Sequence, residues 1–215
     1  MGVPAQRWPA VLSAELSPLA PKVASRTFTA VSADGNGFVS AKDLDICPEA
    51  DQHLHHGENM MQHKTVASQL VLFRRECLTI PQVAGFADRH CAAIRDEAAR
   101  CGLAVAGPWI FVSHGLPDNP DQQYWVDFCL PVAPPLDASL ADGAALKELE
   151  AFSCISETYK GKLADLFAAG YAPLLREAAR AGEQLSGQSR EVYWRWLGAD
   201  SPDNCVEIQF GLSRR

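Results

Sequence analysis

Two kinds of hydrophobic pattern alternate along the chain after about residue 68. Extended runs rich in β-branched and aromatic residues are predicted to be strands, at 69–76, 109–113, 124–130, 152–159, 191–196 and 205–210. Apolar residues at helical spacing predict helices at about 82–101 and 162–181, each ending beside a glycine, Gly102 or Gly182. This order, strand–helix–strand–strand repeated twice, predicts an α+β protein whose helices cover one face of an antiparallel sheet.

The two halves of this region resemble each other. Residues 91–107 align with residues 171–187 without a gap, at an offset of 80 positions, and seven of the 17 aligned positions are identical. The same offset places Val-Asp-Phe at 126–128 over Val-Glu-Ile at 206–208. Because one matching segment is helical and the other extended, we infer an internal duplication of a βαββ module. The copies are expected at residues 68–132 and 150–212.

The first 66 residues differ in character from the rest. They hold five prolines and four of the six histidines with little periodicity, so we predict an irregular extension at 1–66 and a domain at 67–215. Segment 32–43 resembles an EF-hand calcium loop, but Ser32 and Asp43 stand where the loop chemistry asks for a carboxylate and a bidentate Glu. A hairpin turn is the preferred interpretation. The histidines have no neighbouring Cys, and a solvated loop is favoured over a metal site.

Alternation along the predicted strands assigns side chains to the two faces of the sheet. In the last strand Val206, Ile208 and Phe210 form an apolar row that suits packing under the helices. The helix-free face is then predicted to carry five acidic or aromatic residues, Trp125, Asp127, Glu191, Tyr193 and Glu207. Rings and carboxylates together are typical of a site for a flat, apolar or cationic ligand. The same pattern is also typical of a solvated sheet face, with Glu191 and Arg195 loosely paired.

Three short motifs in the second copy occur in a recognisable order. They are Tyr159-Lys160-Gly161 before the helix, Glu191-Val192-Tyr193, and Val206-Glu207-Ile208. Over about residues 68–212 the chain resembles the GyrI-like small-molecule-binding family, which includes the effector-binding domains of multidrug-sensing transcription activators. The resemblance implies two βαββ modules around a pseudo-twofold axis, with a ligand cleft between them and an acid facing aromatic walls.

This resemblance maps onto individual residues of the chain. Glu191 and Tyr193 match the family's Glu-x-Tyr pair, and Glu207 matches its Glu-Ile acid. Strand alternation adds further candidate ligand-binding residues on the first copy, Trp109, Trp125 and Asp127. Tyr159 is a further candidate for closing the cleft, although the pattern does not assign its side chain to one face of the sheet. No helix-turn-helix is predicted ahead of the domain, which argues against transcription control in cis.

Charge and cysteine usage narrow the classes of partner. The chain has 19 Lys and Arg against 26 Asp and Glu, a net charge of −7, and no basic run. This argues against a nucleic-acid binder and against a polybasic membrane surface, and no stretch approaches the roughly 20 apolar residues of a spanning helix. The seven cysteines are scattered without a CxxC pair, so we expect inert thiols, no metal, and a cytoplasmic protein.

Three functions fit these observations. The first is a stand-alone protein that sequesters planar, apolar or cationic drug-like compounds. The second, suggested by the resemblance, is a hydrolase opening strained electrophiles such as cyclopropanoid genotoxins, with Glu191 activating water and Tyr193 donating to the developing anion. The third is an interaction module acting on gyrase or another partner. The spacing shows no Ser-His-Asp or Cys-His set and no phosphate-binding loop, and no cofactor is expected.

Overall fold

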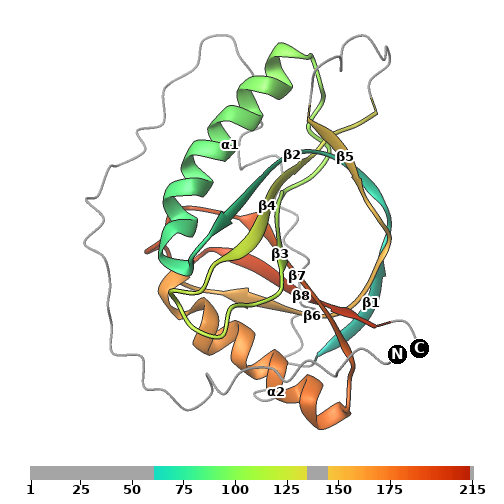
Figure 1. The fold of residues 1–215 in the computed structure, drawn as a ribbon, viewed down its shortest axis with the longest axis vertical. Helices are drawn as coiled ribbons and strands as arrows, with labels where there is room; N and C mark the ends of the chain where they lie inside the picture. The colour runs from blue at the N-terminus through green and yellow to red at the C-terminus, as the bar shows by residue number, and fades with distance from the viewer. Residues whose placement is uncertain (1–60, 135–144, 214–215) are drawn as a thin grey trace.

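The computed structural model describes residues 61–134 and 145–213. In these residues it shows one eight-stranded antiparallel sheet and two helical segments (Figure 1). In chain order the strands are β1 (Gln62–Val66), β2 (Gln69–Leu78), β3 (Trp109–His114), β4 (Tyr124–Pro131), β5 (Leu146–Leu149), β6 (Phe152–Lys160), β7 (Leu185–Arg195) and β8 (Cys205–Leu212). Their order in the sheet is β1-β6-β8-β7-β3-β4-β2-β5. The α+β class is as predicted.

Both predicted helices are present. The first is α1 (Val83–Arg100), which follows a short 3-10 turn. The second begins with a 3-10 turn, passes through a π-helical turn (Leu166–Tyr171) and continues as α2 (Ala172–Ala181). Gly102 and Gly182 have positive φ angles of 61° and 71°, a left-handed conformation that glycine adopts at little cost. The predicted glycine ends are therefore confirmed.

The π-helical turn lies directly on the sheet. A β-carbon added at Gly170 would lie 2.5 Å from Cδ1 of Ile208 and 3.2 Å from Cβ of Tyr159. Only a residue without a side chain allows so close an approach of a helix to the strands below. The next residue, Tyr171, is 6 % exposed and points its hydroxyl toward β7.

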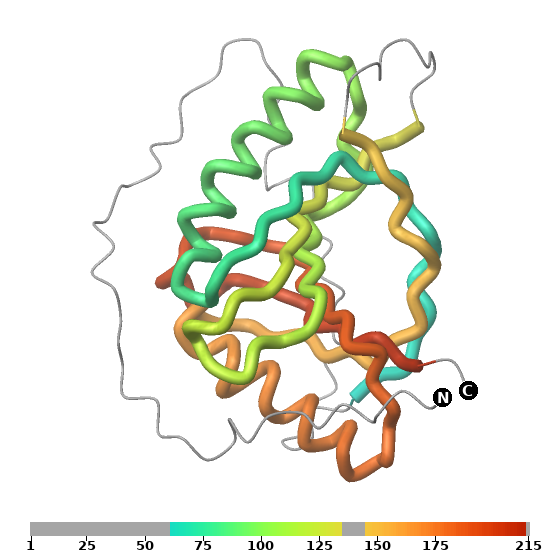
Figure 2. Tube along the Cα trace, in the orientation of Figure 1, coloured from blue at the N-terminus to red at the C-terminus, as the bar shows by residue number. Residues whose placement is uncertain are grey.

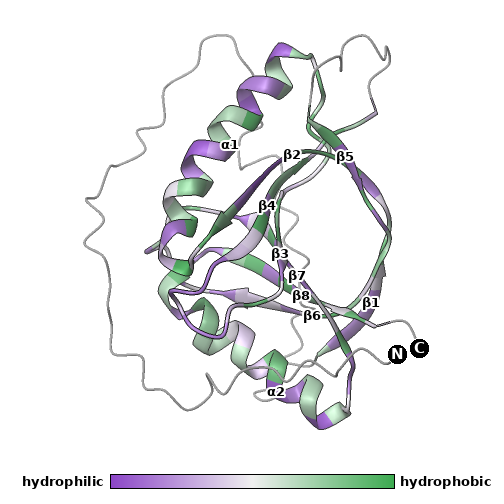
Figure 3. Cartoon of the chain, in the orientation of Figure 1, coloured by the Kyte–Doolittle hydropathy of each residue, from purple (hydrophilic) through white to green (hydrophobic). Residues whose placement is uncertain are grey.

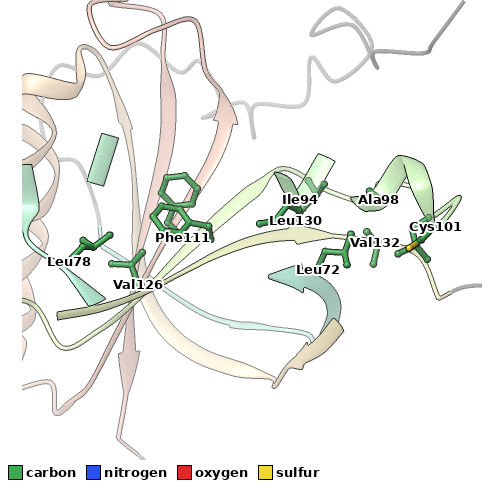
Figure 4. Packing of buried hydrophobic residues seen from close by; sticks show 11 residues of the cluster. Leu72, Leu78, Ile94, Ala98, Cys101, Phe111, Val126, Leu130 and Val132 are labelled. Atoms are coloured by element: carbon green, nitrogen blue, oxygen red, sulfur yellow. The ribbon is translucent and has the colours of Figure 1, made fainter. Parts of the chain in front are cut away.

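Each helix covers its own apolar core on the same face of the sheet. Under α1 the strands contribute residues that include Leu72, Leu78, Phe111, Val126, Phe128 and Leu130, and Figure 4 shows this cluster beside Ile94 and Ala98 of the helix. Under α2 the corresponding strand residues are Ile155, Tyr159, Val206, Ile208 and Phe210. The predicted alternation of β4 and β8 is therefore correct. In Figure 3 hydrophilic and hydrophobic stretches alternate along α1, as expected for a helix with one covered side.

The two ends of the sheet meet. β1 pairs with β6, starting with Gln62 opposite Ser156, and β2 pairs with β5 as far as Leu72 opposite Leu146. Both ladders have the same register, so β1–β2 and β5–β6 form two long strands that lie side by side, as the arcs in Figures 1 and 2 show. The sheet is therefore closed on itself, and its helix-free face lines the inside of a ring.

Strands β1 and β5 were not predicted. β1 lies at the end of segment 1–66, for which an irregular structure was expected, so that expectation is wrong for residues 62–66. Its sequence, QHKTV, is mostly polar and partly exposed, and it lacks the apolar alternation by which strands are recognised. Its partner β6 is distant in sequence, and pairing with that strand orders it.

The two copies meet at the centre of the sheet, where β3 pairs with β7. Phe111 lies directly opposite Glu191 in this pair, and these residues occupy equivalent positions, 80 apart, in the two copies. The pseudo-twofold axis therefore passes between Phe111 and Glu191. The strand that precedes each copy, β1 or β5, pairs with the first strand of the other copy.

Four further expectations concern the N-terminal segment, the histidines, the cysteines and membrane spans. The EF-hand-like segment 32–43 and the histidines at 53, 55 and 56 lie outside the described residues. Five cysteines are free thiols, namely Cys77, Cys91, Cys101, Cys129 and Cys154. Cys205 is disulfide-bonded, so the expectation of free thiols is wrong for this residue. No helix in the described part of the chain is long and apolar enough to cross a lipid bilayer.

Candidate functional site

Glu191 and Tyr193 lie on the helix-covered face of the sheet. Glu191 is directly opposite Phe111 on one side and Ile208 on the other, and both belong to the cores under the helices. Directly opposed residues of an antiparallel pair point to the same face, and Tyr193, two positions on, shares it. The prediction that Glu191 and Tyr193 lie on the helix-free face is therefore wrong. Alternation groups residues within one strand, but it does not relate the faces of two strands.

The sheet divides the other predicted residues in the same way. Asp127 and Glu207 lie on the helix-free face, inside the ring, and Trp125 is half-exposed at the edge of that face. Trp109 lies opposite Tyr193 on the helix-covered face and packs against the core under α1. Tyr159 is buried under the second helical segment, and its hydroxyl donates to the carbonyl of Lys162 at 2.7 Å. Its hydroxyl therefore holds the start of that segment.

Two tyrosine hydroxyls hold the carboxylate of Glu191. Tyr171, at the end of the π-helical turn, donates to Oε1 at 2.6 Å, and Tyr193 donates to Oε2 at 2.6 Å. No Lys, Arg or His of the described residues forms an ion pair with Glu191. Sequence reasoning missed Tyr171, because a single tyrosine in an alanine-rich helix carries no signal of which strand it reaches.

Aromatic rings surround this group from both halves of the molecule. The ring of Tyr193 lies 4.7 Å from that of Phe111 and 5.6 Å from that of Trp196, and Tyr171 stacks with Phe167 at 6.1 Å. Tyr193 packs against the cores under both helices, so the group lies between them. Glu191 is partly exposed, while Trp196 and Phe167 are 45 % and 39 % exposed. Two of the surrounding rings, and part of Glu191, are thus open to solvent.

The electrostatics of this group favour a cation. Burial raises the pKa of Glu191 above its ordinary value of 4.5, and the hydrogen bonds from Tyr171 and Tyr193 act in the opposite direction. Burial, and then the nearby Glu191, raise the pKa of both tyrosines well above 10, so both remain protonated donors. The arrangement is an acid with two fixed donors and no matching charge in the described part of the chain. It is able to bind an organic cation or to accept a proton.

The acids inside the ring are neutralised by their neighbours. Asp127 is fully buried and accepts hydrogen bonds from Arg75 (2.5 and 2.8 Å), His114 (2.9 Å) and Lys147 (2.5 Å). Burial alone would raise the pKa of Asp127, but these three donors outweigh it and hold that pKa well below its usual range. Asp127 therefore has a structural role in the ring, and these contacts give no support to the ligand-binding role that the sequence predicted.

Glu207 is satisfied in the same manner. It accepts from Trp194 (3.2 Å) and Gln209 (3.1 Å) and pairs with Lys64 of β1. Glu207 therefore also has structural contacts inside the ring, and they give no support to its predicted ligand-binding role. Among the described residues no group of His, Cys, Asp and Glu has the arrangement of a metal site.

Comparisons with known proteins bear on the fold. No protein-family model matches the sequence, and no curated protein matches it. The C-terminal domain of EcmrR is similar in structure, with a TM-score of 0.56 at 18 % identity over 73 % of this chain and 98 % of that domain. SAV2435, solved bound to tetraphenylphosphonium, has a TM-score of 0.50 at 14 % identity, covering 72 % of this chain and 94 % of its own.

A hydrolase from Listeria innocua, encoded by lin2189, is also similar, with a TM-score of 0.53 at 10 % identity over 73 % of this chain and 93 % of the hydrolase. Identities this low establish the fold alone. The chain therefore shares the α+β fold of the EcmrR C-terminal domain and of SAV2435.

Proposed function

We propose that the protein binds flat, apolar organic cations beside Glu191 and thereby sequesters drug-like compounds. The observation that carries this proposal is the Glu191 carboxylate, which has two tyrosine donors and no cation among the described residues. A poorly solvated carboxylate is costly unless an opposite charge compensates it. A cationic ligand supplies that charge, and its rings gain cation–π and stacking contacts with Tyr193 and Trp196.

A neighbour in fold supports the choice of ligand class. SAV2435 has been solved with tetraphenylphosphonium, a cation enclosed by four aromatic rings. That compound is a suitable first probe, because its charge is delocalised and its surface is apolar. Its neutral counterpart, triphenylphosphine oxide, has similar rings without the charge, which separates the contribution of Glu191 from that of the aromatic walls.

The test is calorimetric titration of tetraphenylphosphonium into three proteins. We expect the wild type to bind and Glu191→Gln to bind about tenfold more weakly, because a charge contact of this kind contributes on the order of 1.4 kcal/mol. The matched control is Glu148→Gln, which removes the same charge from an exposed position on β5 and should leave the affinity unchanged. Triphenylphosphine oxide should show no difference between the three proteins.

Equal dissociation constants for the wild type and Glu191→Gln would contradict the proposal, as would the absence of binding to the wild type. Circular dichroism of each variant checks that the fold is retained. A Tyr171→Phe variant adds a second measurement, since it keeps the ring and removes one donor to Glu191. That variant should bind the cation at least as well as the wild type does, because the carboxylate loses a competing partner.

A second candidate function is hydrolysis of a strained electrophile. It is favoured by the raised pKa of Glu191, which suits a group that accepts a proton from water. An O–C bond to water would form as a ring C–C bond breaks, and Glu191 would take the proton that the water releases. The electron pair of the broken bond would pass to an electron-withdrawing carbonyl conjugated with the ring, and Tyr193 would donate to the anion that develops there. Mass spectrometry of a cyclopropane-bearing alkylator incubated with the protein tests this. A water adduct formed by the wild type and not by Glu191→Gln supports the enzyme, whereas an unchanged compound supports the binder.

A further inference from the structure

Arg190 precedes Glu191 in β7 and points to the opposite side of the sheet. It lies opposite Val112 on one neighbouring strand and Gln209 on the other, so it faces the inside of the ring. The residue is only 3 % exposed. Adjacent positions of one strand therefore place a carboxylate outside the ring and a guanidinium inside it.

The guanidinium of Arg190 is incompletely satisfied. Nη2 donates to the carbonyl of Glu150 at 3.3 Å, and the group stacks on the ring of Phe152, 3.9 Å from its centroid. Nε and Nη1 are buried and have no hydrogen-bond partner among the described residues. The side-chain Oε1 of Gln209, on the adjacent strand, is also buried without a partner there. Buried donors of a charged group are rarely left unpaired in proteins.

The glycine at position 211 shapes this arrangement. A β-carbon at Gly211 would lie 2.7 Å from the Phe152 ring and 2.3 Å from Oγ of Ser186. The absence of a side chain therefore lets Phe152 occupy the place in which it supports the Arg190 guanidinium. The stacking fixes the plane of the guanidinium and so the direction of its free donors.

No described acid is available to balance Arg190. Asp127 and Glu207, the carboxylates of this face, already bind Arg75, Lys147 and Lys64. The thiols of Cys129 and Cys154 lie near Arg190, but burial raises their pKa values to about 12 and about 11, so they are uncharged at neutral pH. The inside of the ring thus has more positive than negative side chains, although the whole chain carries a net charge of −7.

A hollow lies farther along β3 and β7, at the ends where His114 faces Gln188. It is lined by His114, Gly115, Ser186, Gly187 and Gln188. Gln188 lies directly opposite His114, and the pair is one step along the same face from Arg190 and Val112. The hollow therefore lies one step along the two strands from Arg190, which is not itself among the lining residues. The lining residues offer polar groups at that position.

We propose that Arg190 anchors a second site, inside the ring, for the carboxylate or phosphate group of a small organic anion. The free Nε and Nη1 donors bind the anion, and the hollow at His114 and Gln188 admits it. The site is independent of Glu191, because the sheet separates the two. Val112, Val192 and Trp194 form part of an apolar cluster on this face, so we expect an anion with an apolar body to be favoured over a bare inorganic ion.

The test measures thermal unfolding in benzoate, in phosphate and in sodium chloride of equal ionic strength. A ligand that binds only the folded state raises Tm with concentration. We expect benzoate to raise Tm above the chloride reference in the wild type, and phosphate to do so less. The rise should be lost in Arg190→Met and kept in Arg176→Met, which removes an exposed arginine from α2.

A measurement on the wild type guards against misfolding of Arg190→Met. In protein labelled with 15N-arginine, benzoate should shift the side-chain Nε–H resonance of Arg190, assigned through Arg190→Lys, in a saturable manner. Glu191→Gln should retain the benzoate effect, which separates this site from the cation site proposed above. Equal rises in Tm for Arg190→Met and the wild type, or an Arg190 resonance that benzoate leaves unmoved, would overturn the proposal.

Discussion

The two copies of the βαββ module differ most where they meet. On β3 the first copy places Ile110, Phe111 and Val112 beside the pseudo-twofold axis, and on β7 the second copy places Arg190, Glu191 and Val192 at the equivalent positions. The first copy is therefore apolar on both sides of the sheet, while the second puts a carboxylate on one side and a guanidinium on the other. At the axis, the first copy therefore supplies apolar packing, and the second copy supplies the charged side chains of both proposed sites.

Away from the axis the copies agree. Asp127 and Glu207 are equivalent, and each bonds to the side chain at the equivalent position of the preceding strand, His114 or Trp194. Each also binds a lysine from the strand that closes the ring, Lys147 of β5 or Lys64 of β1. This repeated arrangement joins the two copies, because in both cases the lysine comes from the strand that precedes the other copy. The acids inside the ring therefore support the fold.

The largest effect is expected where the copies agree. Asp127→Asn leaves Arg75 and Lys147 without their shared counter-charge. It should lower the free energy of unfolding by about 3 kcal/mol, because removing one partner of a buried ion pair leaves the other charge uncompensated. Glu207→Gln should cost a similar amount if the two acids are equivalent. Urea denaturation measures both, with the exposed Asp200→Asn as the control.

A loss of unfolding free energy in Asp127→Asn but not in Glu207→Gln would show that the two acids are not equivalent inside the ring. It would then assign the closure of the ring to the β2–β5 side alone.

A smaller effect is expected where the copies differ. Arg190→Met should raise the free energy of unfolding of the ligand-free protein by about 1 kcal/mol, because an apolar side chain replaces a buried charge with unpaired donors. Ile110→Met, at the equivalent position, should lower it by about 1 kcal/mol through altered packing. Changes in unfolding free energy of opposite sign for the two methionine substitutions would show that positions 110 and 190 have different roles in the two copies. If Arg190→Met is as destabilising as Ile110→Met, Arg190 belongs to the structural set.

The smallest effects concern pH and have opposite signs for the two acids. The pKa of Glu191 is raised on folding, so its contribution is fully present below 4.5 and is lost as pH rises through its folded pKa. The pKa of Asp127 is lowered, so its contribution is present above 3.8 and is lost as pH falls toward its folded pKa. Tm measured from pH 4 to 8 should therefore decline less toward high pH in Glu191→Gln than in the wild type.

Identical pH profiles of Tm for Glu191→Gln and the wild type would show that Glu191 titrates alike in the folded and unfolded chain. Binding of tetraphenylphosphonium supplies an independent readout. It should weaken as the pH falls through the pKa of Glu191, and in Glu191→Gln it should not depend on that titration.

Much of the fold was predictable because its signals are local. Helical spacing located α1 and the second helical segment, the glycines at 102 and 182 located their ends, and alternation within β8 placed Ile208 under the helices. The candidate site was predicted only in part. Glu191 and Tyr193 were named, but they were grouped with Asp127 and Glu207 from the other face, and Tyr171 was missed.

The sequence by itself determined which residues form the helices and most of the strands, and that the βαββ module is duplicated. It also determined which side chains share a face within one strand. These properties depend on neighbours a few positions apart. Only the tertiary structure decided that β1 and β5 close the sheet into a ring, and that Glu191 lies between the helices while Arg190 lies inside. Register between strands distant in sequence sets those features, and a slip of one residue would exchange the two faces.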